Sequence, residues 1–162
     1  MEIVIISQLI NKPIKPIGRV CNMICIPIGD TVGKNKNGQD LTMYEVHCQC
    51  AWRLIDANRH IIVASSDFYS PPSTIEWTDS FQWDTKGGNL FDEKILSFNS
   101  SHNNLQITEV RIEECNDLFI EFNSSIIFEA FTDSSQDENW RVIQRSPQSV
   151  HLVSFGNELR TC

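Results

Sequence analysis

Residues 105–131 read LQITEVRIEECNDLFIEFNSSIIFEAF, and this stretch decides the fold class of the chain. Apolar and polar side chains alternate along three short runs, which is the pattern of strands that bury one face. The pairs Asn116-Asp117 and Asn123-Ser124 separate the runs and suit tight turns. Connections this short join antiparallel strands, because parallel strands need long crossovers. The stretch therefore predicts a meander of β-hairpins.

One helix is predicted, at residues 89–99, NLFDEKILSFN. Asn89 is placed to cap its N-terminus, and Asp92 occupies the capping-box position three residues later. Phe91, Ile95 and Phe98 fall at i, i+4 and i+7, which places them on one face of the helix. We expect the helix to pack on the sheets through this face.

Similar patterns predict strands on both sides of the meander. These further strands are expected at residues 18–26, 41–55, 59–66, 140–145 and 151–155. Residues 29–40 contain three glycines and are expected to form a loop. Together the elements predict a mainly β (α+β) fold, an antiparallel β-sandwich or bent β-roll of about seven or eight strands with one short helix.

Length and composition predict an ordinary globular protein. With 162 residues, 41% hydrophobic and 21% charged, the chain can bury a core within one domain spanning 1–162. The apolar start MEIVIISQLI carries Glu2 rather than a basic region and lacks a cleavage site. It therefore predicts a buried strand or the first turns of a helix, not a secretory signal. Six cysteines are then expected to be free thiols, and a cytoplasmic location is expected.

The charge distribution restricts the class of partner. The formal net charge is −8, and residues 67–138 contain fifteen Asp and Glu but only three Lys and Arg. A chain without a basic footprint is not expected to bind nucleic acid or anionic membranes. Carboxylates of the central segment attract a basic protein if folding gathers them on one face. We therefore expect a basic protein partner.

The sequence contains no GxSxG, P-loop, GxGxxG or HExxH motif. A four-thiolate zinc site of Cys21, Cys25, Cys48 and Cys50 is an alternative, but the C-x3-C and C-x-C spacings differ from those of zinc knuckles. Cys48 and Cys50 share one face of the predicted strand, and His47 points to the other. We expect a binding protein rather than an enzyme, with no cofactor and no metal. The alternative is a small enzyme or ligand-binding β protein whose site is assembled from distant residues.

Two irregular segments are candidates for function. Residues 67–88 lie between strand and helix, are punctuated by Pro71-Pro72 and Gly87-Gly88, and interleave five aromatic residues with four acids. Loops this long are uncommon and often functional. The rings either anchor the loop to the core or form a docking surface, where aromatic side chains supply binding energy and carboxylates steer a basic partner.

The second irregular segment is the acidic loop 132–139, TDSSQDEN. It lacks the glycine and ligand spacing of an EF-hand, so we expect a turn capped by Asp133 and stabilised by Ser134 and Ser135. Asp137 and Glu138 then face water or a partner. The predicted partner-binding residues of both segments are Asp67, Glu76, Trp77, Asp79, Trp83, Asp84, Asp137 and Glu138.

Residues 45–145, approximately, resemble a family of small, uncharacterised bacterial proteins. The shared features are a C-x-WR segment, here within HCQCAWRLID, and an F-x-DSS-x-x-E-x-WR turn. In this chain the turn consists of Phe131, Asp133, Ser134, Ser135, Glu138, Trp140 and Arg141. In size and acidity such proteins are similar to immunity proteins of toxin–immunity and contact-dependent growth inhibition systems. The resemblance implies a protein that neutralises a cognate, nuclease-like basic toxin by covering its active site with an acidic surface.

Overall fold

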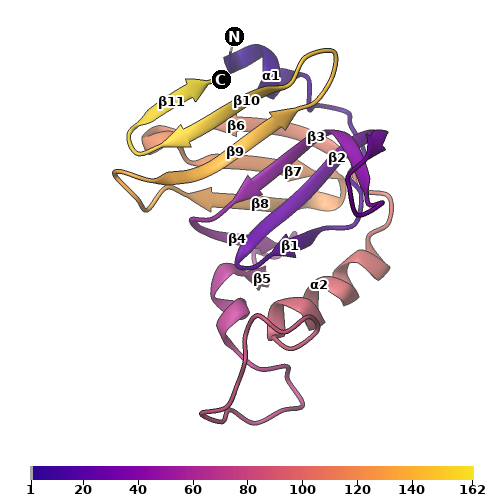
Figure 1. The fold of residues 1–162 in the computed structure, drawn as a ribbon, viewed down its shortest axis with the longest axis vertical. Helices are drawn as coiled ribbons and strands as arrows, with labels where there is room; N and C mark the ends of the chain where they lie inside the picture. Colours follow the sequence, from indigo (N-terminus) through magenta and orange to yellow (C-terminus); the bar gives the residue numbers. More distant parts are fainter. Residues whose placement is uncertain (1) are drawn as a thin grey trace.

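The computed structural model describes residues 2–162. Two antiparallel sheets lie face to face, with the six-stranded sheet in front of the five-stranded sheet in Figure 1. The first sheet, in the order β1-β2-β3-β9-β10-β11, comprises Gly18–Val20, Met23–Lys34, Asp40–Cys48, Glu138–Gln144, Val150–Phe155 and Glu158–Thr161. The second, in the order β5-β4-β8-β7-β6, comprises Ile61–Ala64, Ala51–Ile55, Ile126–Phe131, Leu118–Phe122 and Ile107–Ile112. The mainly β, antiparallel fold class predicted from the sequence is confirmed.

Alternate side chains of both sheets form one hydrophobic core between them. Ile26 and Val46 of the first sheet and Ile120 and Phe128 of the second are fully buried. The meander is confirmed as β6, β7 and β8, in which Ile120 pairs with Val110 on one side and with Phe128 on the other. This register keeps the apolar side chains of all three strands on the core face.

The expected strand at 41–55 is wrong, because the chain changes sheets within it. β3 ends at Cys48 in the first sheet, and β4 begins at Ala51 in the second. Even-numbered residues from Thr42 to Leu54 are buried throughout, since both strands face the same core. The alternation of buried and less buried residues therefore continues from β3 into β4, and it does not reveal where the chain changes sheets.

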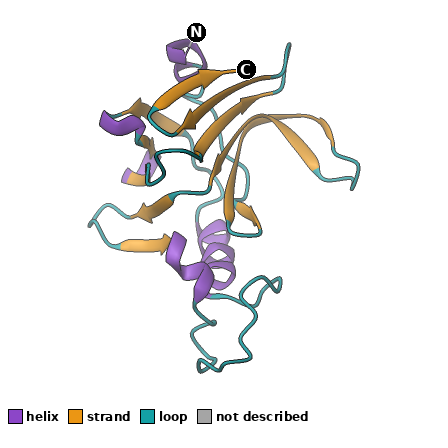
Figure 2. Cartoon of the chain, turned by 60° about the vertical axis from the view of Figure 1, so that its left-hand side comes forward, coloured by secondary structure: helices purple, strands orange, loops and turns teal. Residues whose placement is uncertain are grey.

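Other differences account for the eleven strands in the described part of the chain. The loop expected at 29–40 is largely strand, because β2 continues to Lys34, so that the hairpin with β3 projects as an arm (Figure 2). β1 and β11 are edge strands of three and four residues, too short for a recognisable alternation.

Two α-helices are described. The predicted helix is confirmed as α2, Leu90–Ser101, and Asn89 caps it by accepting a hydrogen bond from the Asp92 amide at 2.8 Å. The helix lies at the lower end of the sandwich in Figure 1 and buries Phe91, Ile95 and Phe98, as expected. The N-terminal apolar stretch forms a second helix, α1, Glu2–Ser7. No helix within residues 2–162 is both long enough and apolar enough to cross a membrane.

Candidate functional site

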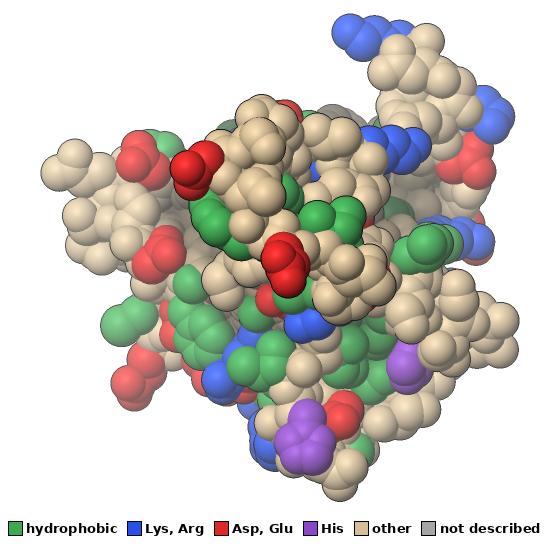
Figure 3. Space-filling model, turned by 90° about the horizontal axis from the view of Figure 1, so that it is seen from below, with side chains coloured by type: hydrophobic (Ala, Val, Ile, Leu, Met, Phe, Trp, Pro, Cys, Tyr) green, Lys and Arg blue, Asp and Glu red, His purple; other side chains and the backbone are tan. Residues whose placement is uncertain are grey.

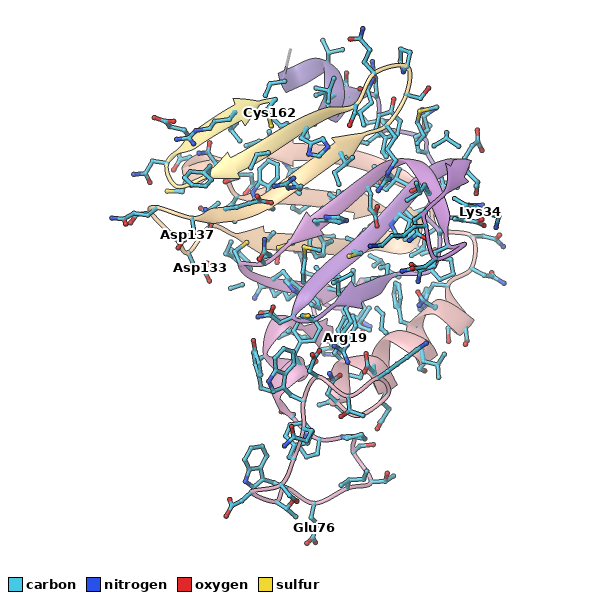
Figure 4. All side chains as sticks on the ribbon, viewed as in Figure 1. Arg19, Lys34, Glu76, Asp133, Asp137 and Cys162 are labelled. Atoms are coloured by element: carbon cyan, nitrogen blue, oxygen red, sulfur yellow. The ribbon has the colours of Figure 1, made fainter. Side chains whose placement is uncertain are left out.

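Residues 70–89 form a loop that projects from one end of the molecule, at the bottom of Figure 4. Its two ends meet where the Leu90 amide donates to the Ser70 carbonyl oxygen at 2.8 Å. Near its start, the amide and hydroxyl of Ser73 both donate to the Glu93 carboxylate on α2. None of the residues from 71 to 88 is buried. The loop is therefore closed at its base and mostly exposed along its length.

Arg19 of β1 fastens the second half of this loop. Its guanidinium donates two hydrogen bonds to Asp92, at 2.7 and 2.8 Å, and one to Asp84 at 3.1 Å. The Gly87 amide also donates to Asp92, at 2.8 Å. Burial opposes ionisation of Asp92, but the hydrogen bonds from Arg19 and the loop amides outweigh it, so the pKa of Asp92 lies below its usual value. Asp84, a predicted partner-binding residue, is thus an anchor of the loop.

The aromatic residues of this region divide into two groups. Phe68 is fully buried, with its ring 4.5 Å from that of Phe91, so it anchors the loop to the core. Trp83 lies at the base, where its ring meets Tyr69 edge-on at 5.3 Å. Trp77 contacts only Phe81 among the aromatic rings, edge-on at 5.4 Å, and is 63% exposed. The anchoring interpretation therefore holds for Phe68, whereas the docking interpretation of the exposed Trp77 stays a prediction.

The tip of the loop combines apolar and acidic side chains. Ile75 is 58% exposed beside the exposed Trp77. Glu76 and Asp79 are exposed as well, and neither has an ion-pair partner among the described residues. Figure 3, viewed from the loop end, shows hydrophobic and acidic side chains side by side on this face. We call Ile75, Glu76, Trp77 and Asp79 the loop tip.

The other predicted partner-binding residues lie elsewhere. Asp67 accepts a hydrogen bond from the Ala64 amide at 3.0 Å and pairs with Lys94 at 3.2 Å, so it stabilises the turn before the loop. Asp137 is exposed but lies far from the loop tip, at the side of the sheets in Figure 4. The eight predicted residues do not form one continuous surface.

Glu138 is not free, because it forms an ion pair with Arg141 on the same strand, β9. Its carboxylate and the Arg141 Nε are 2.5 Å apart, and its side chain is largely covered. The expectation that Glu138 faces water or a partner is therefore wrong. The pattern of two acids in a row gave no indication that only Asp137 would remain unpaired.

The acidic loop is a corner at which the chain returns from the second sheet to the first. The expectation that Asp133 caps its own turn is wrong. Its carboxylate instead accepts a hydrogen bond from the Ala51 amide at 3.1 Å, in the neighbouring crossover between β3 and β4. Ser134 caps the turn instead, because its hydroxyl oxygen accepts from the Asp137 amide at 2.9 Å. The two places where the chain changes sheets are thus joined.

Asn139 is the residue of this corner that sequence reasoning missed. It is fully buried, and its side-chain oxygen accepts hydrogen bonds from the amides of Asp133 and Ser134, at 3.1 and 3.0 Å. Its backbone oxygen accepts from the Gln49 amide at 2.9 Å. Asn139 is one of two amide side chains among acids and serines, and nothing in the sequence marks it for this role. The DSS turn of the sequence is therefore a structural device of the sandwich.

The cysteines do not form the four-thiolate site considered above. Cys48 and Cys50 lie in the core with their sulfur atoms 3.4 Å apart, whereas Cys21 is exposed. Burial raises the pKa of Cys48, which keeps it a thiol. Cys25 lies on the opposite, outer face of the first sheet, beside His47.

A hollow of about 390 Å³ is lined by both a carboxylate, Asp56, and a histidine, His102. This is the combination that the alternative, enzymatic interpretation requires. The His102 ring stacks on Phe98 at 4.5 Å, and its Nδ1 lies 3.1 Å from the Phe98 carbonyl oxygen, so the ring completes the end of α2. The hollow therefore offers less support for function than the loop tip does.

Comparisons of the chain with protein-family models, with curated proteins and with solved structures gave no match. The resemblance to small bacterial proteins and to immunity proteins therefore stays a prediction. What the fold and the site define is a two-sheet β protein with a projecting loop, anchored at its base and both aromatic and acidic at its tip.

Proposed function

We propose that this protein is a binding protein and that its loop tip recognises a basic protein partner. The observation that carries the proposal is the exposure of Trp77 between two unpaired carboxylates, Glu76 and Asp79, on a loop that projects from the body. A tryptophan is the most frequent kind of binding hot spot, together with tyrosine and arginine. Two free carboxylates add attraction toward positive charge.

The anchoring of the loop base favours tight binding. Arg19, Asp84 and Asp92 hold one side of the loop, and Glu93 holds the other. A loop that is already restrained loses less conformational entropy when a partner orders it. Burial of Trp77, at about 25 cal/mol per Å² of apolar surface, contributes roughly 2–4 kcal/mol before these costs.

A partner with a concave, basic cleft fits this shape best. A projecting acidic and aromatic tip can enter such a cleft, whereas a flat acidic sheet face can only cover its rim. A nuclease active site is a cleft of this kind, because it binds the phosphate backbone of its substrate. We therefore propose an immunity protein that blocks a nuclease-like toxin in the bacterial cytoplasm.

The test is a binding and protection assay with a basic toxin domain that co-purifies with the tagged protein from its native host. The test variant is Trp77→Ala, and the matched control is Leu96→Ala, which removes an equally exposed apolar side chain, 69% exposed, on α2. We expect the wild type and Leu96→Ala to bind the toxin domain and protect cells, and Trp77→Ala to bind at least about tenfold more weakly. Equal binding by Trp77→Ala contradicts a role for the loop tip.

The electrostatic part of the proposal is tested separately. We expect Glu76→Gln with Asp79→Asn to slow association and to reduce its dependence on salt, with little effect on dissociation. Asp137→Asn, at a distant exposed position, is the control and should change neither rate. Absence of any complex with the toxin domain would reject the immunity role itself.

A further inference from the structure

The outer face of the first sheet brings three side chains of different chemistry together. Glu45 and His47 are two residues apart on β3, so their side chains point to the same face. In the β2–β3 pairing, Cys25 lies directly opposite His47, and Pro27 lies opposite Glu45. The three residues therefore form a triangle across two neighbouring strands, on the face that turns away from the core.

The distances within this triangle suit a metal ion. One ligand atom from each residue, the Cys25 sulfur, a Glu45 carboxylate oxygen and a His47 ring nitrogen, lies within 4.8 Å of the other two. The His47 Nε2 and Glu45 Oε1 are 3.4 Å apart. In a tetrahedral zinc site, bonds of about 2.0–2.3 Å place ligand atoms roughly 3.3–3.7 Å from one another. The distance between His47 and Glu45 already lies within this range.

The surroundings hold these side chains in place. Arg145 pairs with the other carboxylate oxygen of Glu45 and also donates to the Thr42 carbonyl oxygen at 2.9 Å. Such outer contacts orient a ligating carboxylate and leave its second oxygen free. The triangle is partly shielded from water, since Cys25 is 8% exposed and the side chains of Glu45 and His47 are 16% and 20% exposed.

The nearby cations are already neutralised. Arg145 is paired with Glu45, and Arg141, opposite His47 on the other side of β3, is paired with Glu138. Because the Glu45 charge is already shared with Arg145, the negative charge that a divalent ion gains here is mainly that of the Cys25 thiolate. The metal–sulfur bond replaces the S–H bond, and the proton passes to the solvent.

We propose that Cys25, Glu45 and His47 form a zinc-type site with three protein ligands and a fourth coordination position open to solvent or to a partner. A set of one sulfur, one nitrogen and one oxygen ligand favours zinc over magnesium or calcium, which prefer oxygen alone. The site joins β2 to β3 and is separate from the loop tip. The sequence predicted no metal, because the residues that meet here come from strands whose register it does not reveal.

The test is a titration of the reduced, metal-free protein with Co²⁺, followed by displacement with Zn²⁺. We expect one cobalt per chain, a thiolate-to-cobalt charge-transfer band in the near ultraviolet and visible bands typical of tetrahedral cobalt, all abolished by zinc. Cys25→Ser should lose the charge-transfer band. Cys50→Ser, which alters the buried thiol pair instead, should keep it.

A second variant covers the case in which Cys25→Ser does not fold. His47 is partly exposed, and His47→Gln should fold and bind zinc at least about tenfold more weakly in competition with a chromophoric chelator. His60→Gln, at an exposed histidine, is its control and should bind zinc as the wild type does. Absence of a charge-transfer band in the wild type, its persistence in Cys25→Ser, or its loss in Cys50→Ser would overturn the proposal.

Discussion

At the scale of single residues, Asn139 and Trp140 hold the two sheets together at one corner. Asn139 accepts hydrogen bonds at both places where the chain changes sheets, from the amides of Asp133 and Gln49. Trp140, the next residue, is fully buried, and its indole nitrogen donates to the Asn116 carbonyl oxygen at 2.8 Å, in the turn between β6 and β7. One hydrogen bond thus joins β9 of the first sheet to the meander of the second.

We expect Trp140→Phe to destabilise the protein by about 2–3 kcal/mol. The substitution leaves a cavity and removes the donor to Asn116, whose carbonyl loses its partner. The matched control is Trp52→Phe, because Trp52 is 2% exposed but its indole nitrogen has no partner among the described residues. Urea denaturation should show Trp140→Phe to cost about 1 kcal/mol more than Trp52→Phe. Equal losses would mean that the hydrogen bond contributes nothing.

At the scale of secondary-structure elements, the sequence predicts where strands and helices form better than it predicts how the strands connect between the sheets. The alternation of apolar residues identified β6, β7 and β8, and the capping residue Asn89 identified the start of α2. The same alternation hid the corner between β3 and β4, because a strand that bends from one sheet into the other keeps the same face toward the core. The partners of the acids were also hidden, since Arg19 lies 73 residues from Asp92.

The contact between β1 and α2 predicts a pH effect. Asp92 sits in the first turn of α2 and accepts hydrogen bonds from Arg19 and Gly87. At pH 7 we expect Asp92→Asn to lower the free energy of unfolding by about 1–3 kcal/mol, because a charge-assisted pair and a favourable interaction with the helix dipole are lost. Asp79→Asn, at an unpaired exposed position, should have no effect.

The decrease in the free energy of unfolding caused by Asp92→Asn should become smaller at acidic pH. The folded-state pKa of Asp92 lies below its unfolded value, so its carboxylate stabilises the fold fully above about pH 4. That stability disappears as the pH falls through the folded-state value, where the wild-type side chain also becomes neutral. Urea denaturation of both proteins between pH 7 and pH 3 measures the difference. A difference that stays constant with pH would show that the charge of Asp92 is not its source.

At the scale of the whole molecule, the acidic excess is less concentrated than the sequence suggests. Residues from outside the acidic central segment pair with acids inside it: Arg19 with Asp84 and Asp92, and Arg53 with Glu129 at 2.6 Å. The sequence could indicate the irregular loop through its prolines and glycines. It could not indicate which of the acids stay unpaired, because their partners are distant in sequence, and for the same reason it could not indicate the Cys25–Glu45–His47 triangle.

The free energy of unfolding of the two-sheet body is therefore expected to depend little on the loop tip. No residue between 71 and 88 is buried, and the contacts that close the loop involve its two ends. Replacement of residues 74–82 by a Gly-Ser sequence of equal length should change the free energy of unfolding by less than about 1 kcal/mol, because no core contact is lost.

The same replacement should abolish binding of the basic partner, since it removes Trp77 and both free carboxylates together. Thermal and urea denaturation, with titration of the partner into the variant, separate the two effects. A large loss of stability would show that the tip belongs to the folding unit of the sandwich. If neither stability nor binding changes, the recognition surface lies elsewhere on the molecule. If stability is unchanged and binding is lost, the loop tip serves recognition and not folding, which is the result we expect.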